Sequence, residues 1–229
     1  ILTDWGSIVL LAAGQTLVII SGGIDLSVGG TLAISGVTSA WVMSTVLGFD
    51  ITTTGSDAYP PLLVGGLVAV GTGLLVGLVN AILITKLRIV PFVATLSTMG
   101  ATLGFAIIIS NGMPIGGPND FSLISPINPT WMPLSWAVIG VIVVVTAVGL
   151  FLHKSRFGLH TYAIGSNSFA ARAAGINVEM HLTKVYALAG ALAGLAGFYV
   201  YLRLGAGSPS SGVMRELDAI AAVVIGGAS

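Results

Sequence analysis

The sequence HKSRFGLHTYAIGSNSFAARAAGINVEMHLTK, residues 153–184, is the one long polar segment in an otherwise apolar chain. It contains all three histidines, four of the eight basic residues and a single acid, Glu179. In a protein that crosses a membrane, a large basic loop stays in the cytoplasm by the positive-inside rule. This segment therefore predicts a cytoplasmic loop, and it sets the orientation of every other segment.

Inside this loop the sequence predicts a short helix at Phe169–Ala174. Ser166 or Asn167 can cap its free N–H groups, and Gly175 suits the left-handed position that ends a helix. Counted from a cap at Asn167 to Ala174, at about 1.5 Å per residue, the helix would be only about 12 Å long. A helix this short neither spans a bilayer nor forms a domain. We therefore interpret it as a projecting helix that binds another protein.

Composition identifies a polytopic membrane protein. Of the 229 residues, 55% are hydrophobic and 7% are charged, whereas a soluble domain has roughly 25% charged residues. Eight basic residues balance eight acids, so net charge gives no indication of a nucleic-acid partner. The absence of cysteine excludes disulfides and thiolate metal sites. The sequence begins without Met and stops at Ser229, so we expect the interior of a longer protein, with at least one helix missing at each end.

Apolar runs predict an all-α fold in a single transmembrane domain, residues 1–229. About six membrane-spanning segments are visible, followed by a terminal partial or re-entrant helix. The first run has only fourteen residues, which is short of the roughly 20 that cross a bilayer as a helix. The apolar runs are residues 7–20, 31–49, 62–85, 92–110, 134–152 and 185–202, and the terminal helix starts at Arg215.

Charge placement tests this topology. Asp50, Asp57 and Asp120 fall in loops that alternation places outside, where no basic residue occurs. Trp131 and Trp136 would lie at the outer interface. Loops 86–91 and 153–184 are therefore predicted to be cytoplasmic, because they contain six of the eight basic residues: Lys86, Arg88, Lys154, Arg156, Arg172 and Lys184.

The segment SGGIDLSVGG, residues 21–30, predicts a broken helix near Gly22–Gly30. It places Asp25 where two short apolar runs meet, and a charge at membrane depth costs roughly 2.5–3.5 kcal/mol on insertion scales. Broken helices are tolerated where their backbone is buried in protein or lines a wet cavity. Asp25 and Ser27, together with Gln15, would then lie beside a polar route. Alternatively, Asp25 is the solvated cap of a helical hairpin at the inner interface.

A second acidic site precedes the last apolar run. Glu216 and Asp218 could form a gate or a docking rim on the outer side, with Arg215 or Arg203. Alternatively, they cap the N-terminus of the last helix, where carboxylates interact favourably with the positive end of the helix dipole. The three histidines lack the spacing of metal ligands, and we assign no metal site. No phosphate-binding Gly–Lys–Ser/Thr motif and no G-x-S-x-G motif occurs in the sequence, so we assign no catalytic residue.

Glycines four residues apart occur in several spans. Small residues let helix backbones approach closely where lipid provides no hydrophobic drive. We therefore predict close helix packing at Gly73/Gly77, Gly100/Gly104 and Gly190/Gly194.

Three stretches together resemble the permease subunit of bacterial ATP-binding-cassette importers for ribose, xylose and related sugars. They are SGGIDLSVGG (21–30), SRFGLHTYAIGSNSFAARAAGINV (155–178) and ELDAIAAVVIGG (216–227). The wider family includes branched-chain amino-acid permeases. The sequence departs from the family pattern in two ways. Loop 50–61 is longer than expected, and the family's first helix and last helices are missing from this sequence.

The resemblance implies several partners in the bacterial inner membrane. These are a second permease copy or paralogue, two ATP-binding ATPase subunits inside, a periplasmic or lipid-anchored sugar-binding protein outside, and the surrounding lipid. It also implies that residues 165–176 contain a coupling helix that docks on the ATPase subunit, with Arg172 able to pair with an acid there. The residues assigned to this coupling are Gly165, Ser166, Asn167, Ala170, Ala171, Arg172, Ala174, Gly175 and Ile176.

The expected function is therefore import of a neutral monosaccharide, a pentose such as xylose or ribose, by alternating access. The chain would bind no cofactor, because ATP would bind the partner subunit. Sugar hydroxyls need hydrogen-bonding groups without much net charge, which suits a path at Gln15, Asp25, Ser27 and Asn111. Two alternatives remain open. One is an ion-coupled secondary carrier that uses Asp25 or Glu216, and the other is an intramembrane aspartyl hydrolase that uses Asp25 and Asp218.

Overall fold

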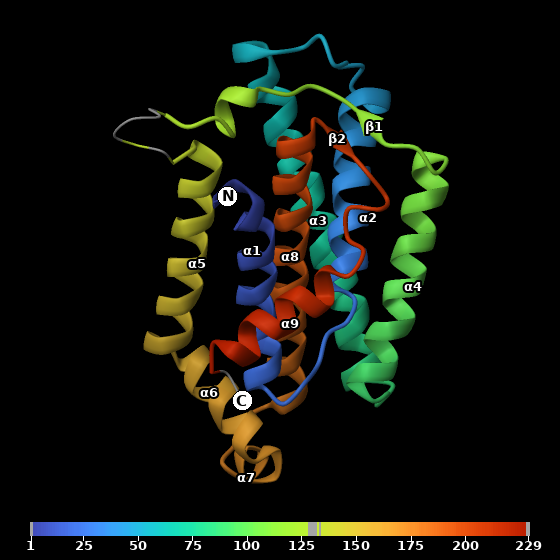
Figure 1. Ribbon diagram of the computed structural model, residues 1–229. Coiled ribbons are helices and arrows are strands. Elements are labelled where there is room, and N and C mark those ends of the chain that lie inside the picture. Colours follow the sequence, from blue (N-terminus) through green and yellow to red (C-terminus); the bar gives the residue numbers. More distant parts are fainter. Residues whose placement is uncertain (1, 128–131, 133, 228–229) are drawn as a thin grey trace.

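Helices running along one common direction make up most of the chain in the computed structural model, which describes residues 2–127, 132 and 134–227 (Figure 1). The α-helices are α1 Leu2–Ile20, α2 Val28–Trp41, α3 Tyr59–Thr85, α4 Pro91–Ser110, α5 Trp136–Lys154, α6 Arg156–Ser166, α7 Ser168–Ala173, α8 Val178–Leu204 and α9 Arg215–Ile225. A π-helical turn, Val42–Val46, continues α2, and 3-10 turns lie at Gly55–Ala58 and Phe121–Leu123. Strand β1, Ile115–Gly116, pairs antiparallel with β2, Ala206–Gly207.

Four of the described helices are long and apolar enough to cross a membrane: α3 with its preceding turn, α4, α5 and α8. This confirms a polytopic all-helical membrane protein, but the predicted count of about six spans is not confirmed. Helix α2 has 14 residues, or about 21 Å at 1.5 Å per residue, and a bilayer core is about 30 Å thick. The chain breaks between α1 and α2, and the α-helical part of α2 is by itself shorter than a full span.

Helix α8 is the centre of the bundle. It packs against α1, α2 and α3, and 72% of its membrane-length window is buried, compared with 17% for α5. In Figure 1, α4 and α5 lie at the two sides of the bundle, with α8 between them. The apolar side chains of α4 and α5, such as Phe105 and Val143, therefore face outward, as lipid-facing side chains do.

Glycines bring α3 and α8 together. A side-chain carbon added at Gly73 would collide with the Gly190 carbonyl oxygen, and one at Gly194 would collide with that of Ala69. The predicted packing role is confirmed for the glycine pairs of α3 and α8. It is wrong for Gly100 and Gly104, where no described atom lies within 4 Å of an added carbon. Spacing alone could not show which face of α4 those two glycines occupy.

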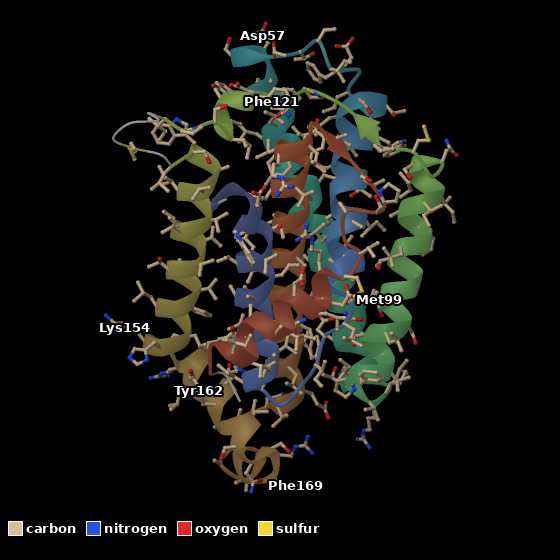
Figure 2. All side chains as sticks on the ribbon, viewed as in Figure 1. Asp57, Met99, Phe121, Lys154, Tyr162 and Phe169 are labelled. Atoms are coloured by element: carbon tan, nitrogen blue, oxygen red, sulfur yellow. The ribbon has the colours of Figure 1, made fainter. Side chains whose placement is uncertain are left out.

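The two ends of the bundle carry opposite charge. Figure 2 places Asp57 at one end and Lys154 and Phe169 at the other. At the acidic end, hydrogen bonds from Thr52 lower the pKa of Asp50, and those from Ser122 lower that of Asp120. Trp136 begins α5 at this same end and is exposed, as expected for an interfacial tryptophan. Trp131 lies outside the described residues.

We predict that Gly73→Leu destabilises the protein and that Gly104→Leu does not. The first forces α3 away from α8, and overpacking of this kind costs about 1–3 kcal/mol or more. The second adds a side chain to a position with no neighbour in the described structure. Thermal melting of the two purified variants in detergent would check this, and equal melting temperatures would show that α3 and α8 are not packed as described.

Candidate functional site

The break between α1 and α2 positions the candidate site. Helix α1 ends at Ile20, and Gly22 takes the left-handed conformation with φ +84°, which glycine adopts without steric cost. In Figure 1 the chain leaves the lower end of α1 and rises to the start of α2, about halfway along the bundle. The break therefore places the N-terminal end of α2 inside the protein.

Asp25 supports this N-terminal end from within the bundle. Its Oδ1 accepts hydrogen bonds from the Ser27 N–H at 2.8 Å and from the Ser27 hydroxyl at 2.6 Å. The Asp25 side chain is buried, with the residue 1% exposed. This burial rules out the solvated hairpin cap, so Asp25 acts as a buried acceptor at the start of α2.

Two side chains from neighbouring helices complete the network. The Gln15 amide of α1 donates to the backbone carbonyl of Asp25. The Asn80 amide of α3 donates to the Ser27 hydroxyl at 2.7 Å. All of these side chains are buried. The structure thus brings the predicted Gln15, Asp25 and Ser27 together, and their role in a polar route remains a prediction.

Sequence reasoning missed three members of this neighbourhood. Asn80 is the one carboxamide in the apolar run 62–85, and that isolation was the signal that could have found it. On α4, the Thr95 hydroxyl accepts from the Leu26 N–H at 3.1 Å. On α8, the Tyr186 hydroxyl lies so close to Gly23 that an added side-chain carbon there would be only 2.5 Å from it.

Asn111 does not belong to this network. It follows the last residue of α4 with φ 49°, caps that helix in the left-handed conformation and is exposed. Thr95 lies near the start of α4, so most of the length of the helix separates Asn111 from the break. Its geometry is that of a helix C-cap.

Helix α9 brings Glu216 against the start of α2. It crosses the bundle obliquely (Figure 1), and Gly29 packs directly against the Glu216 carboxylate. Asp218 instead faces Arg215 at 3.8 Å, and its side chain is 53% exposed. Asp25 and Asp218 therefore have different partners, so the structure gives no support to a catalytic pair of aspartates.

A cleft of about 900 Å³ lies between α1, α5 and α9. Its lining is mainly apolar and includes Ile8, Val145 and Val223. Two ion pairs lie along it, Arg203–Asp4 at 3.0 Å and Arg215–Asp218 at 3.8 Å. The predicted gating or docking role of Arg215, Glu216 and Asp218 stays a prediction.

Helix α7 has the capped form that the sequence predicts. The Asn167 side chain accepts from the Ala170 N–H at 3.0 Å, and Gly175 has φ +87° after the helix ends. In Figure 1, α7 lies beyond α6 at the basic end of the bundle, and Phe169 on it is 84% exposed. Helix α6 before it was not predicted.

The predicted coupling residues separate into packing residues and surface residues. Ala171 is buried against Ile164 and Val178, and a side-chain carbon at Gly165 would collide with the Ile20 carbonyl of α1. Ile176 is partly buried in the same cluster as Ala171. The exposed residues of the set are Gly165, despite its close approach to α1, and Ser166, Asn167, Ala170, Arg172, Ala174 and Gly175.

Two of the three histidines of this loop, His160 and His181, pack against neighbouring side chains. The His181 Nε2 and the Thr161 hydroxyl form a hydrogen bond of 2.8 Å, and the ring of His181 lies 4.6 Å from that of Phe157. The rings of His160 and His181 meet edge to face, with their centroids 5.8 Å apart. These contacts join α6 to the start of α8.

The fold and the site together define a class of protein. Four membrane-length helices, a helix broken around a buried carboxylate and a capped helix at the basic end are the features of a polytopic membrane transport protein.

The comparisons with known proteins give the family. All of residues 1–229 match the family described as "Branched-chain amino acid transport system / permease component", and the chain belongs to this family. It is 35% identical over 225 residues to the ribose import permease protein RbsC of Escherichia coli, covering 96% of this chain and 65% of the relative. It is 39% identical over 231 residues to the galactofuranose transporter permease protein YtfT of E. coli, with coverages of 100% and 63%.

A third relative is the inner membrane ABC transporter permease protein YjfF of E. coli, which is 37% identical over 238 residues, covering 99% of this chain and 66% of the relative. The chain therefore spans somewhat less than two thirds of the length of these relatives. No solved structure matches the chain.

We predict that Asp25→Asn lowers transport more than it lowers expression. The amide oxygen of asparagine can still accept from the Ser27 N–H, so the start of α2 keeps its cap, but the negative charge is lost. Uptake per molecule of membrane-inserted protein would measure the effect, with Asp57→Asn at the exposed acidic end as the control. Equal losses of uptake and expression would assign Asp25 a structural role alone.

Proposed function

We propose that this chain is the membrane-embedded part of a permease subunit in an ATP-driven importer for a neutral monosaccharide of pentose size. The observation that carries the proposal is the likeness over 96–100% of the chain to permeases named for ribose and galactofuranose. The sequence has no phosphate-binding motif of its own, so ATP would bind a partner subunit.

Helix α7 is the proposed contact with that partner. Its exposed residues lie at the basic end of the bundle, where Arg172 adds a positive charge. Ala171, Ile164 and Val178 fix the inner side of α7 to α6 and to the start of α8. A movement of the partner would therefore shift α7 as a rigid unit and not merely bend a loop.

Helix α8 would carry this movement into the membrane. It begins at Val178, in the cluster that holds α7, and it packs against α1, α2 and α3 along the bundle. The break between α1 and α2 is not helical, and at Gly23 it lies against Tyr186 of α8. A rigid shift acting on a hinge of this kind is how alternating access would open the bundle first to one side and then to the other.

The polar network suits an uncharged solute. Gln15, Ser27 and Asn80 provide amide and hydroxyl groups from three elements, and Asp25 is the one acid among them. These groups are buried in the present arrangement, so a sugar would meet them only after the break has moved. A second permease copy or paralogue, a sugar-binding protein outside and membrane lipid complete the proposed assembly.

An ion-coupled secondary carrier is the second candidate function, because a buried carboxylate at membrane depth often marks an ion pathway. The two candidates differ in their energy source. Uptake that stops on ATP depletion and persists without an ion gradient supports the importer. Uptake that survives ATP depletion and collapses with the gradient supports the carrier.

We predict that Ala170→Tyr uncouples ATP hydrolysis from uptake without unfolding the permease. Ala170 is exposed on α7, so the ring would obstruct a docked partner and leave the packing of α7 intact. We expect at least a tenfold loss of sugar-stimulated ATPase activity, since about 1.4 kcal/mol of lost docking free energy is a factor of ten.

Two control variants separate docking from folding. Ser56→Tyr adds the same ring at the exposed acidic end and should leave the ATPase activity unchanged. Ala171→Leu should instead lower the melting temperature, because Ala171 is buried. Normal stimulation in Ala170→Tyr would mean that this face of α7 does not contact the ATPase.

A further inference from the structure

We propose that the polar network around Asp25 binds one Na⁺ ion, between the broken segment, α1, α3 and α8. The site would be a structural ion site that holds the break closed, and it stands independently of which solute the protein carries. Its ligands would be the Asp25 carboxylate and the side-chain oxygens of Gln15, Asn80 and Tyr186.

Three buried oxygens in this neighbourhood have no hydrogen-bond partner in the described structure: Gln15 Oε1, Asn80 Oδ1 and the Tyr186 hydroxyl. All three side chains are at most 1% exposed. Each amide uses its nitrogen to hold residues 25–27 in place, which leaves its oxygen beside the same segment. Buried polar groups are normally satisfied, so two amide oxygens and a phenolic hydroxyl without partners call for an explanation.

An ionised Asp25 would also leave the charge of the site unbalanced. Asp25 is buried, and neither of the ion pairs found among the described residues includes it. Its bonding partner Ser27 supplies only neutral donors. Burying a carboxylate without a countercharge is costly. A bound cation would offset that cost and would satisfy several orphaned oxygens at once, whereas a proton on Asp25 would supply a single donor.

The ligand set selects the ion. Carboxylate, amide and hydroxyl oxygens suit hard cations. A single carboxylate matches one positive charge, and the described residues contain no group of three or more His, Cys, Asp or Glu side chains that would hold a transition metal. The cleft along α1 reaches Thr16 but is not lined by Gln15, Asp25 or Asn80. That cleft therefore does not open onto the proposed ion site.

The test is the melting temperature of the purified full-length permease in lipid nanodiscs, in NaCl, KCl or choline chloride at equal ionic strength. We expect a saturable rise in NaCl that reaches about 5 °C when Na⁺ is in hundredfold excess over its Kd. Asp25→Asn should abolish the rise, and Asp57→Asn, at the exposed end, should retain it. Binding of radioactive ²²Na⁺ to the native protein should saturate at one ion per permease.

Several results would overturn the proposal. Equal melting temperatures in the three salts would mean that water molecules satisfy these oxygens. Stabilisation by acid in place of Na⁺ would mean that Asp25 is a neutral carboxylic acid. If Asp25→Asn does not fold, the ²²Na⁺ measurement on the native protein decides, and the absence of saturable binding rejects the site. Because none of these readouts involves ATP or sugar, they are independent of the proposed transport function.

Discussion

The structure depends on how the chain satisfies its backbone where it stops being helical inside the bundle. In a membrane no water is present to take over the lost hydrogen bonds, so the break between Ile20 and Val28 needs side chains to do so. Asp25 accepts from the start of α2, Gln15 donates to the broken segment, and Thr95 accepts from it. These contacts tie the segment to α1 and α4, and Asn80 joins it to α3 through Ser27. Without them, α2 could not begin inside the protein.

The same arrangement links the two ends of the molecule. The small cluster around Ala171 fixes α7 to the start of α8. The glycines of α8 then let that helix lie against α3 along its length, and the break lies against both helices through Asn80 and Tyr186. The basic end and the buried network are thus joined by one rigid element. A transport protein driven from one side of the membrane needs a connection of this kind between its drive and its path.

Local features could be predicted from the sequence, and features that depend on helix rotation could not. Asn167 and Gly175 gave the cap and the end of α7, because capping depends on neighbours in the chain. The pattern around Asp25 gave the broken helix for the same reason. In contrast, the burial of Ala171, the contact of Gly165 with α1 and the open faces of Gly100 and Gly104 depend on distant partners. Asn80 and Tyr186 join Asp25 from helices far away in sequence. The predicted count of about six spans is not confirmed, because the length of an apolar run does not show where its helix begins.

The central claim is that α7 lies inside the cell and receives its movement from a nucleotide-hydrolysing partner. Residues 1–229 contain no cysteine. In the variant Phe169→Cys, the new thiol is therefore the one site among these residues that a membrane-impermeant maleimide can label. The most direct measurement is its labelling rate in inverted and right-side-out vesicles, with and without the ATPase subunit. The account predicts labelling in inverted vesicles alone, and protection when the ATPase is bound. Labelling from the outside, or an unchanged rate with the ATPase present, would contradict it.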